Sequence, residues 1–312
     1  PVWAAALGAA IASGASCSLF GGSLPESSVA TAAALIGFIA HRLSIRNEFN
    51  PYACSMIAAF AATIVAWLIP FVLALPTMWY ALVSCTIFLI PGFPIINAAS
   101  DVINRFISSG MTRAIDTMLI VGGMTFGIAF AILSTGIANI SDVHILPTDA
   151  YISQAFAAAL AAGGFSIIFN TPKKLLGIVA FEGIVTMLIR NILMNEIGLS
   201  QAVGSFVAAA VVGISALKVI HIVHTPNTLL IIPPIIPLVP GVLLYRLLFA
   251  VLYIQTISAE EFLEALRFGI SGITIILAIV VGVSIPNIFI QKRMEAQQQR
   301  EIDAIIATRG DV

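Results

Sequence analysis

Long apolar stretches recur along the whole chain and leave few folds open to it. Each is roughly 20 residues long, the length that an α-helix needs to cross about 30 Å of hydrocarbon. With 60% hydrophobic and 9% charged residues, the chain has too little polar surface to coat a soluble domain. The stretches lack the alternation of an outer-membrane barrel. We therefore predict an all-α, polytopic membrane protein. Its ten transmembrane helices are expected at about residues 2–20, 27–41, 51–69, 79–99, 115–136, 150–170, 175–195, 200–219, 227–250 and 267–290, with the fourth and ninth broken.

Lysine and arginine residues are distributed unequally between the two ends of these helices. If the chain starts on the cytosolic side, eleven of them fall on that side, and three, Arg190, Arg246 and Arg267, fall on the other. Because cytosolic loops carry an excess of cations, both visible ends are expected in the cytosol and the protein in the cell membrane. A chain that opens with Pro-Val-Trp is expected to be preceded by an N-terminal region.

The cysteines indicate neither a disulfide framework nor a metal site. Cys17, Cys54 and Cys85 all lie inside predicted helices, where small buried apolar residues are expected. The chain also contains no nucleotide-binding P-loop, so pumping driven by ATP would require another chain. We expect no cofactor, no bound metal and no nucleic-acid partner.

The two halves of the chain match when one is shifted by 149 residues, the spacing between Pro91 and Pro240. The matching residues are Pro91-Gly92 with Pro240-Gly241, Gly123 with Gly272, Thr125 with Thr274, and Phe20 with Phe169. Each half contains five predicted helices, an odd number, so the second half must enter the membrane from the opposite side. Such inverted repeats are typical of secondary transporters, whose substrate sites lie near the bilayer midplane at the repeat interface.

The predicted organisation has two membrane units and two polar segments. They are a first five-helix repeat at 1–136, an extracytoplasmic linker at 137–149, a second five-helix repeat at 150–290 and a cytosolic helical tail at 291–312.

Prolines interrupt the fourth and ninth predicted helices. Pro91 and Pro94 remove backbone donors from the fourth helix, and Pro233, Pro234, Pro237 and Pro240 do so in the ninth. Freed backbone groups persist in a membrane only where they face protein or a wet cavity. Two half-helices should therefore begin near the midplane, each with a positive dipole end and unpaired amides that suit a carboxylate-bearing solute. The alternative is a pair of kinks that only shapes helix packing.

Polar residues follow both breaks. Asn97 and Arg246 each lie five residues after the glycine of the break, and Asn97, Asp101 and Arg105 share one helix face. Asp101 is a candidate for substrate binding or proton coupling; a simple pair between Asp101 and Arg105 near the cytosolic boundary is the alternative.

Glu182 is a second candidate for proton coupling. It lies inside the seventh predicted helix among the apolar neighbours of VAFEGIV. Intramembrane carboxylates are rare and often act as proton relays, so Glu182 is expected to take up and release protons during transport. A structural, hydrogen-bonded glutamate is the alternative. Arg246 could be its charge partner or a substrate anchor.

Several segments resemble the threonine/serine exporter family. The first membrane half of that family is similar to PGFPIINAASDVI and SSGMTRAIDT, and its second half, a separate subunit in some relatives, to AAALAAGGFSIIFNTPKKLL, GSFVAAAVVG and TPNTLLIIPPIIPLVPGVLLYR. The resemblance covers nearly all of residues 1–290. It implies export of threonine and serine driven by the proton gradient, whereas two-subunit relatives are associated with succinate. Carried over by motif, the site residues are Pro91, Gly92, Pro94, Asn97, Asp101, Pro240, Gly241, Tyr245 and Arg246.

The residues alone therefore predict a secondary transporter for a small carboxylate-bearing solute. The resemblance implies that this solute is an amino acid and that it is transported out of the cell. Its partners would be the substrate, protons and membrane lipid, with assembly into a homo-oligomer left open. Export of a dicarboxylate is the close alternative, and a passive channel is another. An enzyme is not expected, since neither HExxH nor GxGD occurs in the chain.

Overall fold

A computed structural model describes the chain at residues 2–76, 78–136, 150–223, 227–240 and 257–310. Between the last two ranges it describes residues 243, 246, 247, 250, 251, 254 and 255. Every element in these parts of the chain is a helix, so the predicted all-α class is confirmed. The predicted linker at 137–149 lies outside the described residues, as do Gly241 and Tyr245 of the predicted site.

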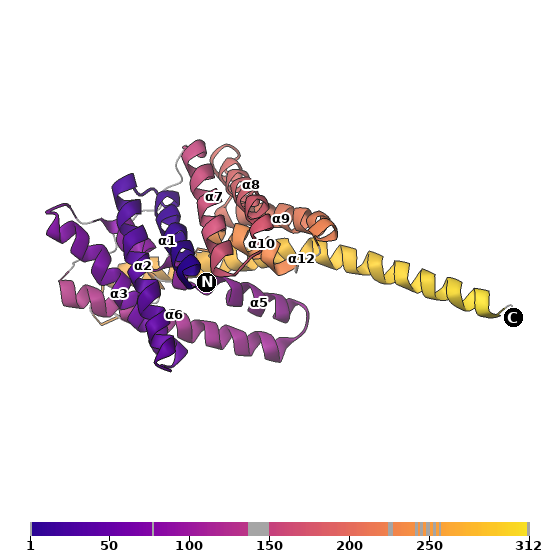
Figure 1. Cartoon of the computed structure of the whole chain (residues 1–312), viewed down its shortest axis with the longest axis horizontal. Coiled ribbons are helices and arrows are strands. Elements are labelled where there is room, and N and C mark those ends of the chain that lie inside the picture. The colour runs from indigo at the N-terminus through magenta and orange to yellow at the C-terminus, as the bar shows by residue number, and fades with distance from the viewer. Residues whose placement is uncertain are drawn as a thin grey trace.

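The elements of the two halves follow one another in a similar order. In the first half they are α1 (Val2–Leu19), α2 (Leu24–Arg46), α3 (Pro51–Val72), α4 (Trp79–Ser84), η1 (Ile87–Leu89), α5 (Gly92–Ile103) and α6 (Ile107–Thr135). In the second half they are α7 (Tyr151–Ile168), η2 (Lys173–Leu175), α8 (Leu176–Asn195), α9 (Gln201–Val223), α10 (Asn227–Ile235), η3 (Ile236–Leu238) and α12 (Ala259–Gly310). Helix α12 continues without a break to Gly310 and extends well beyond the bundle (Figure 1).

Seven of the described helices are long and apolar enough to cross a membrane, as expected for a multi-pass membrane protein. An eighth span results if the segments Trp79–Leu89 and Gly92–Ile103, which meet at 57°, cross together as one broken helix. The described apolar parts of α9 and α10 are shorter, at Gln201–Leu217 and Leu229–Leu238. The arrangement of ten helices therefore stays a prediction.

Helix α2 is longer than predicted. Expected as a short helix at 27–41, it runs from Leu24 to Arg46. The backbone N–H of Ser23 donates to Oε2 of Glu26 at 2.8 Å, and a proline lies in the first turn, so the helix starts earlier. Helices α6 and α12 begin at 107 and 259, eight residues before their predicted starts at 115 and 267. In all three cases the prediction followed the apolar stretch, whereas the helix continues beyond it.

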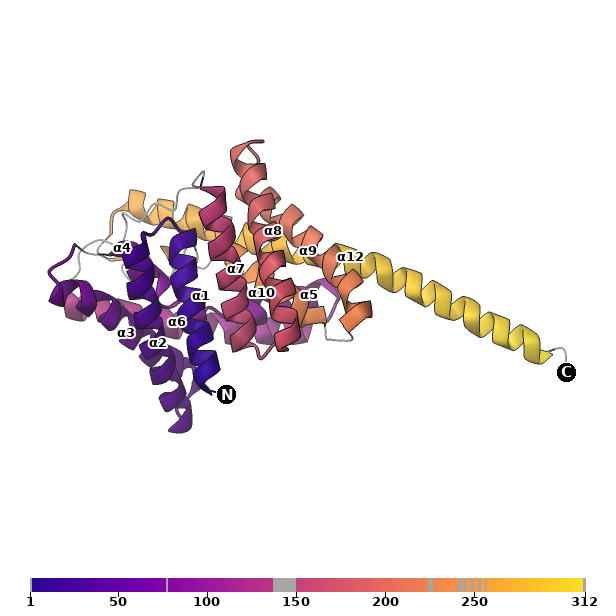
Figure 2. The same cartoon turned by 45° about the horizontal axis from the view of Figure 1, so that its top comes forward.

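The helices pack in the same order in each half. In the first half α1 packs on α2, α2 on α3 and α3 on α6; in the second half α7 packs on α8, α8 on α9 and α9 on α12. The halves meet where α1 packs against α7, and both views place these helices side by side (Figures 1 and 2). Glycine permits this close contact, because a Cβ atom on Gly164 would lie 2.7 Å from the backbone oxygen of Gly8.

The turn that ends α1 recurs at the end of α7. After α1 the N–H of Gly22 donates to the carbonyl of Cys17 at 2.9 Å, and Gly21 has a φ of 99°. After α7 the N–H of Thr171 donates to the carbonyl of Ser166 at 2.9 Å, and Asn170 has a φ of 55°. A residue in the left-handed region commonly ends a helix in this way. These equivalent turns are again 149 residues apart (21 against 170).

Candidate functional site

The backbone takes the same course up to the proline of each predicted break, Pro91 in the first half and Pro240 in the second. A 3-10 turn, η1 or η3, is followed by one extended residue and then by proline. The extended residue is Ile90 in the first half (φ −61°, ψ 119°) and Val239 in the second (φ −65°, ψ 122°). A residue before proline avoids the helical region, and proline lacks an N–H, so the sequence itself imposes this course.

The two breaks lie against each other inside the protein. A Cβ atom on Gly92 would lie 3.2 Å from Cγ1 of Ile236, across the two breaks. Pro91 and Pro240 are both buried, and Ile236 is 4% exposed. This burial agrees with the expectation that freed backbone groups face protein rather than lipid.

A small cavity separates the breaks. Its volume, taken as the space open to the centre of a water molecule, is about 10 Å³, which is room for about one water. Its lining is Ser16, Leu19, Phe20, Ile87 and Ile90 from the first half and Phe165, Ile236, Pro237 and Val239 from the second. Ser16 supplies a hydroxyl to this lining and donates it to the Ala12 carbonyl at 2.7 Å. The cavity is therefore mostly apolar and too small for a solute of several heavy atoms, so its walls must separate before such a solute can enter.

The start of α5 carries fewer free amides than expected. The N–H of Gly92 donates to the Ile90 carbonyl at 2.8 Å, and that of Ile95 donates to the Pro91 carbonyl at 3.0 Å. Pro94 has no N–H. Within the described first turn this leaves the Phe93 amide for a ligand, in place of the several that were expected. In the second half, Leu243 donates to the Pro240 carbonyl at 3.0 Å.

Asn97 and Asp101 lie on α5 at increasing distance from the break. Asn97 is half-buried, and its side chain has no hydrogen-bond partner within the described part of the chain. Asp101 lies about 14 Å along the helix axis from Gly92. The structure therefore places Asn97 near the break and Asp101 at the other end of α5.

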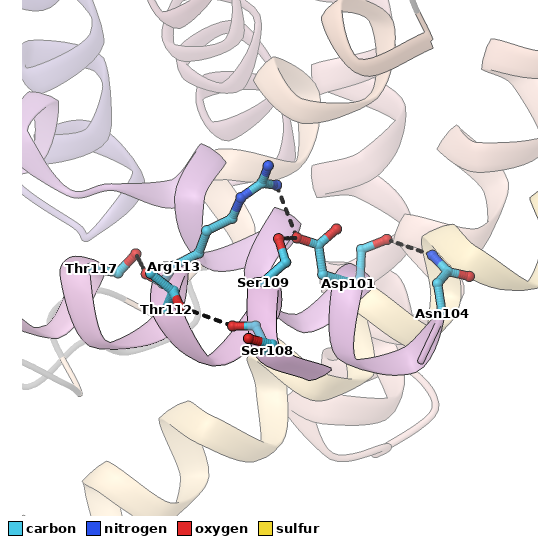
Figure 3. A network of polar contacts seen from close by, with 8 residues as sticks. Asp101, Asn104, Ser108, Ser109, Thr112, Arg113 and Thr117 are labelled. Atoms are coloured by element: carbon cyan, nitrogen blue, oxygen red, sulfur yellow. Dashed lines mark hydrogen bonds and ion pairs between the residues drawn. The ribbon is translucent and has the colours of Figure 1, made fainter. Parts of the chain in front are cut away.

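Asp101 belongs to a polar network that joins α5 to α6. It forms an ion pair with Arg113 at 3.1 Å and accepts a hydrogen bond from Ser109 at 3.1 Å (Figure 3). The alternative pairing of Asp101 with Arg105 is wrong. Arg105 lies exposed in the turn after α5, with a φ of 67°, because the chain reverses there into α6. This network holds the half-helix α5 and helix α6 together as a hairpin.

Glu182 is buried in the second half, away from the cavity lining. It lies on α8 with 5% of its surface exposed, and its Oε1 is 2.6 Å from the hydroxyl of Ser215 on α9. Its other carboxylate oxygen, Oε2, is buried and has no partner among the described residues. Among the described residues Glu182 is thus hydrogen-bonded through one of its two carboxylate oxygens.

Arg246 lies against α12 rather than beside Glu182. Its guanidinium carbon is 4.8 Å from the ring centroid of Phe268, and the carboxylate of Glu264 interacts with it electrostatically. Of the residues predicted by motif, Pro91, Gly92 and Pro240 are buried at the breaks, and Arg246 lies against a different helix.

Sequence reasoning did not single out Ser16, Phe165 or Ser215. Phe20, which also lines the cavity, is one of the residues that match between the two halves. The cavity lies where the end of α1 approaches both breaks. A search around the repeated residues could therefore have found Ser16. Ser215 carries no signal in the sequence, because its contact with Glu182 depends on how α8 packs on α9.

Two family models match the chain in tandem. One, described as a threonine/serine exporter (ThrE), covers residues 1–134, and the second, described as "Threonine/Serine exporter, ThrE", covers residues 154–289. An uncharacterized protein of Haemophilus influenzae is 26% identical over 167 residues, which are 53% of this chain and 56% of that protein. The probable succinate transporter subunit YjjP of Escherichia coli is 26% identical over 141 residues, 44% of this chain and 54% of that protein.

The chain spans about half the length of the curated relatives that it matches. No solved structure matches it. The tandem family matches leave uncovered only the junction between the halves and the end of α12. The chain belongs to the threonine/serine exporter family.

Proposed function

We propose that the chain is a secondary active transporter, rather than an enzyme, that exports small amino acids such as threonine and serine. Export would be coupled to protons moving inward, and the substrate site would lie near the midplane between the two broken helices. The observation that carries this proposal is the cavity between two breaks of identical backbone course, with walls from both halves. Family membership supports the choice of amino acids.

The halves would be inverted repeats. Three observations support this: the shared order of helix packing, the turn that recurs after α1 and α7, and the break that recurs after η1 and η3. With five membrane crossings in each half, the second unit would run in the opposite direction to the first. Both visible ends of the chain would then lie in the cytosol.

Alternating access would come from relative movement of the two halves. In the described structure the cavity admits about one water, so it is too small to hold the substrate. Rocking at the contact between α1 and α7 would separate the cavity walls toward one side and then toward the other. The hairpin of α5 and α6, held by Asp101 and Arg113, would move as one body.

Substrate recognition would use the polar groups around the first break. The amide of Phe93 and the positive end of α5 suit a carboxylate. The amide group of Asn97 and the hydroxyl of Ser16 could bind the ammonium or the side-chain hydroxyl of threonine or serine. The resemblance to the family motifs also assigns substrate binding to Asp101, Tyr245 and Arg246. Asp101 would contribute only from the far end of α5.

Glu182 would carry the coupled proton. A carboxylate in an apolar core is unfavourable unless it is neutralised or fully hydrogen-bonded. Glu182 has one hydrogen-bonded oxygen and one without a partner among the described residues, so gain and loss of a proton would change its local energy strongly.

Export of a dicarboxylate is the second candidate. The E. coli relative described as a probable succinate transporter subunit favours it. The two candidates share one carboxylate and differ in the second charged group, so direct competition separates them.

The proposal is tested by transport into proteoliposomes. Uphill movement of labelled threonine should require a proton gradient and should stop when a protonophore collapses that gradient. Excess unlabelled serine should compete, and excess succinate should not. Competition by succinate without competition by serine would support the dicarboxylate candidate. Downhill equilibration with no uphill phase would contradict a carrier and support a channel.

Replacement of Glu182 by glutamine should abolish gradient-driven accumulation while leaving exchange between internal and external threonine in place. Glutamine keeps the size and polarity of the side chain but cannot release a proton. Glu260→Gln, which removes an exposed carboxylate from the first turn of α12, is the control and should transport normally. An unchanged pH dependence of transport in Glu182→Gln would remove Glu182 from the coupling step.

Asn97→Ala should raise the substrate concentration for half-maximal transport about tenfold, as expected for one lost hydrogen bond of about 1.4 kcal/mol. Asn104→Ala is the matched control, because Asn104 lies exposed at the other end of α5. Equal affinity in wild type and Asn97→Ala would place Asn97 outside the site.

A further inference from the structure

The hydroxyl of Ser215 lies between two acceptors and has only one hydrogen to give. Its Oγ is 2.6 Å from Oε1 of Glu182 and 2.9 Å from the carbonyl oxygen of Val212. Both distances are within hydrogen-bonding range, and the shorter one is typical of a hydrogen bond to a carboxyl or carboxylate group. Because a serine hydroxyl carries one hydrogen, it cannot donate to both oxygens at once.

We propose that Ser215 is the positioning residue for proton coupling. The charge of Glu182 determines which oxygen accepts the single hydrogen of the Ser215 hydroxyl, and this changes the hydrogen bonding of helix α9. This inference rests on the proposed function of Glu182. When Glu182 is protonated, its O–H donates to Ser215 Oγ, and the Ser215 O–H donates to the Val212 carbonyl. When the proton leaves the carboxyl group for water on the open side, the Ser215 O–H rotates and donates to the carboxylate. The Val212 carbonyl then loses this bond.

The first half of the chain has no such pair at the equivalent positions. Shifted by 149 residues, Glu182 corresponds to Ala33 and Ser215 to Ala66. Both alanines are buried at 1% exposure or less, and they lie in the same apolar cluster between α2, α3 and α4. In the first half, helices α2 and α3 therefore pack together with alanine at both equivalent positions. The glutamate and serine of the second half are not needed for packing, which favours a role in the transport cycle.

The position of Val212 links this pair to the break. Val212 is 1% exposed and belongs to the large buried cluster that also contains Ile235 and Ile236, and Ile236 lines the cavity. A change in the hydrogen bonding of α9 at Val212 therefore acts inside the cluster that forms one wall of the cavity.

Few other charges stand near this pair. Helix α10 contributes no titratable residue between Asn227 and Ile235. On α8 itself the other charged residue is Arg190. On the remaining elements that pack against α8, the titratable residues are Tyr151 on α7, Lys173 and Lys174 on η2, and Lys218 and His221 on α9. The side chains of Lys218 and His221 lie outside the described part of the chain. Of these, the two lysines of η2 are exposed. Ser215 is the group with a defined hydrogen bond to the carboxyl.

The test measures the titration of Glu182 in the purified full chain, independently of transport. Infrared difference spectra between acid and alkaline buffer should contain a carboxyl signal that disappears in Glu182→Gln. Ser215→Ala should move the midpoint of this signal by about one to two pH units toward higher pH, because the charged form loses its donor. Ser215→Thr, which restores a hydroxyl, should return the midpoint close to the wild-type value. In proteoliposomes the pH profile of transport should move with the signal.

Ser205→Ala is the matched control. Ser205 is a fully buried serine of α9, whereas Ser215 is half-buried, and the Ser205 hydroxyl has no partner among the described residues. Its removal should leave the midpoint in place. An unshifted midpoint in Ser215→Ala, equal shifts in Ser215→Ala and Ser205→Ala, or a wild-type carboxyl signal that Glu182→Gln does not remove would each overturn the inference. If the midpoint moves as expected but no solute is transported, the proposed function fails and the role of Ser215 in Glu182 titration stands. The Glu182→Ala, Ser215→Ala double variant, which copies the first half, should fold and should have no such signal.

Discussion

The structure depends on the requirement that backbone polar groups inside a membrane find partners within the protein. A helix broken by proline leaves some of these groups free, and each free group in lipid costs several kcal/mol. The chain breaks a helix in each half and meets this requirement by burying the two breaks against each other. A Cβ atom on Gly92 would lie only 3.2 Å from Cγ1 of Ile236, so the two interrupted segments lie against each other where the halves meet. The cavity lies there because prolines and an extended residue on each side prevent regular helix packing.

The halves share a backbone plan but differ in the side chains that carry chemistry. Ser16 lines the cavity from the first half, where its counterpart in the second half is Phe165. Glu182 and Ser215 occupy places that are filled by Ala33 and Ala66 in the first half. Single residue differences between the halves thus supply polarity and a titratable group within a similar backbone.

The sequence predicted the helical class well, because the length of an apolar stretch acts locally, whereas the inverted repeat of ten helices stays a prediction. It predicted helix ends less well. Apolar stretches mark the part of a helix inside the hydrocarbon, whereas α2, α6 and α12 continue beyond it. The substrate site stays a prediction. Pro91, Gly92 and Pro240 are buried at the breaks. Asp101 pairs with Arg113 and Arg246 lies against Phe268, since both contacts depend on how α6 and α12 fold back. Ser215 could not be found, because two helices must first be placed side by side.

The central claim is that the two breaks face each other across the substrate path. In a chain from which Cys17, Cys54 and Cys85 have been removed, Gly92→Cys and Ile236→Cys together test it most directly by disulfide cross-linking in the membrane. The account predicts that oxidation joins the two cysteines, that transport then stops, and that reduction restores it. Gly122→Cys, whose Cβ meets no atom within 4 Å, should not be joined to Ile236→Cys. Failure of the first pair to cross-link, or full transport by the cross-linked protein, would contradict the account.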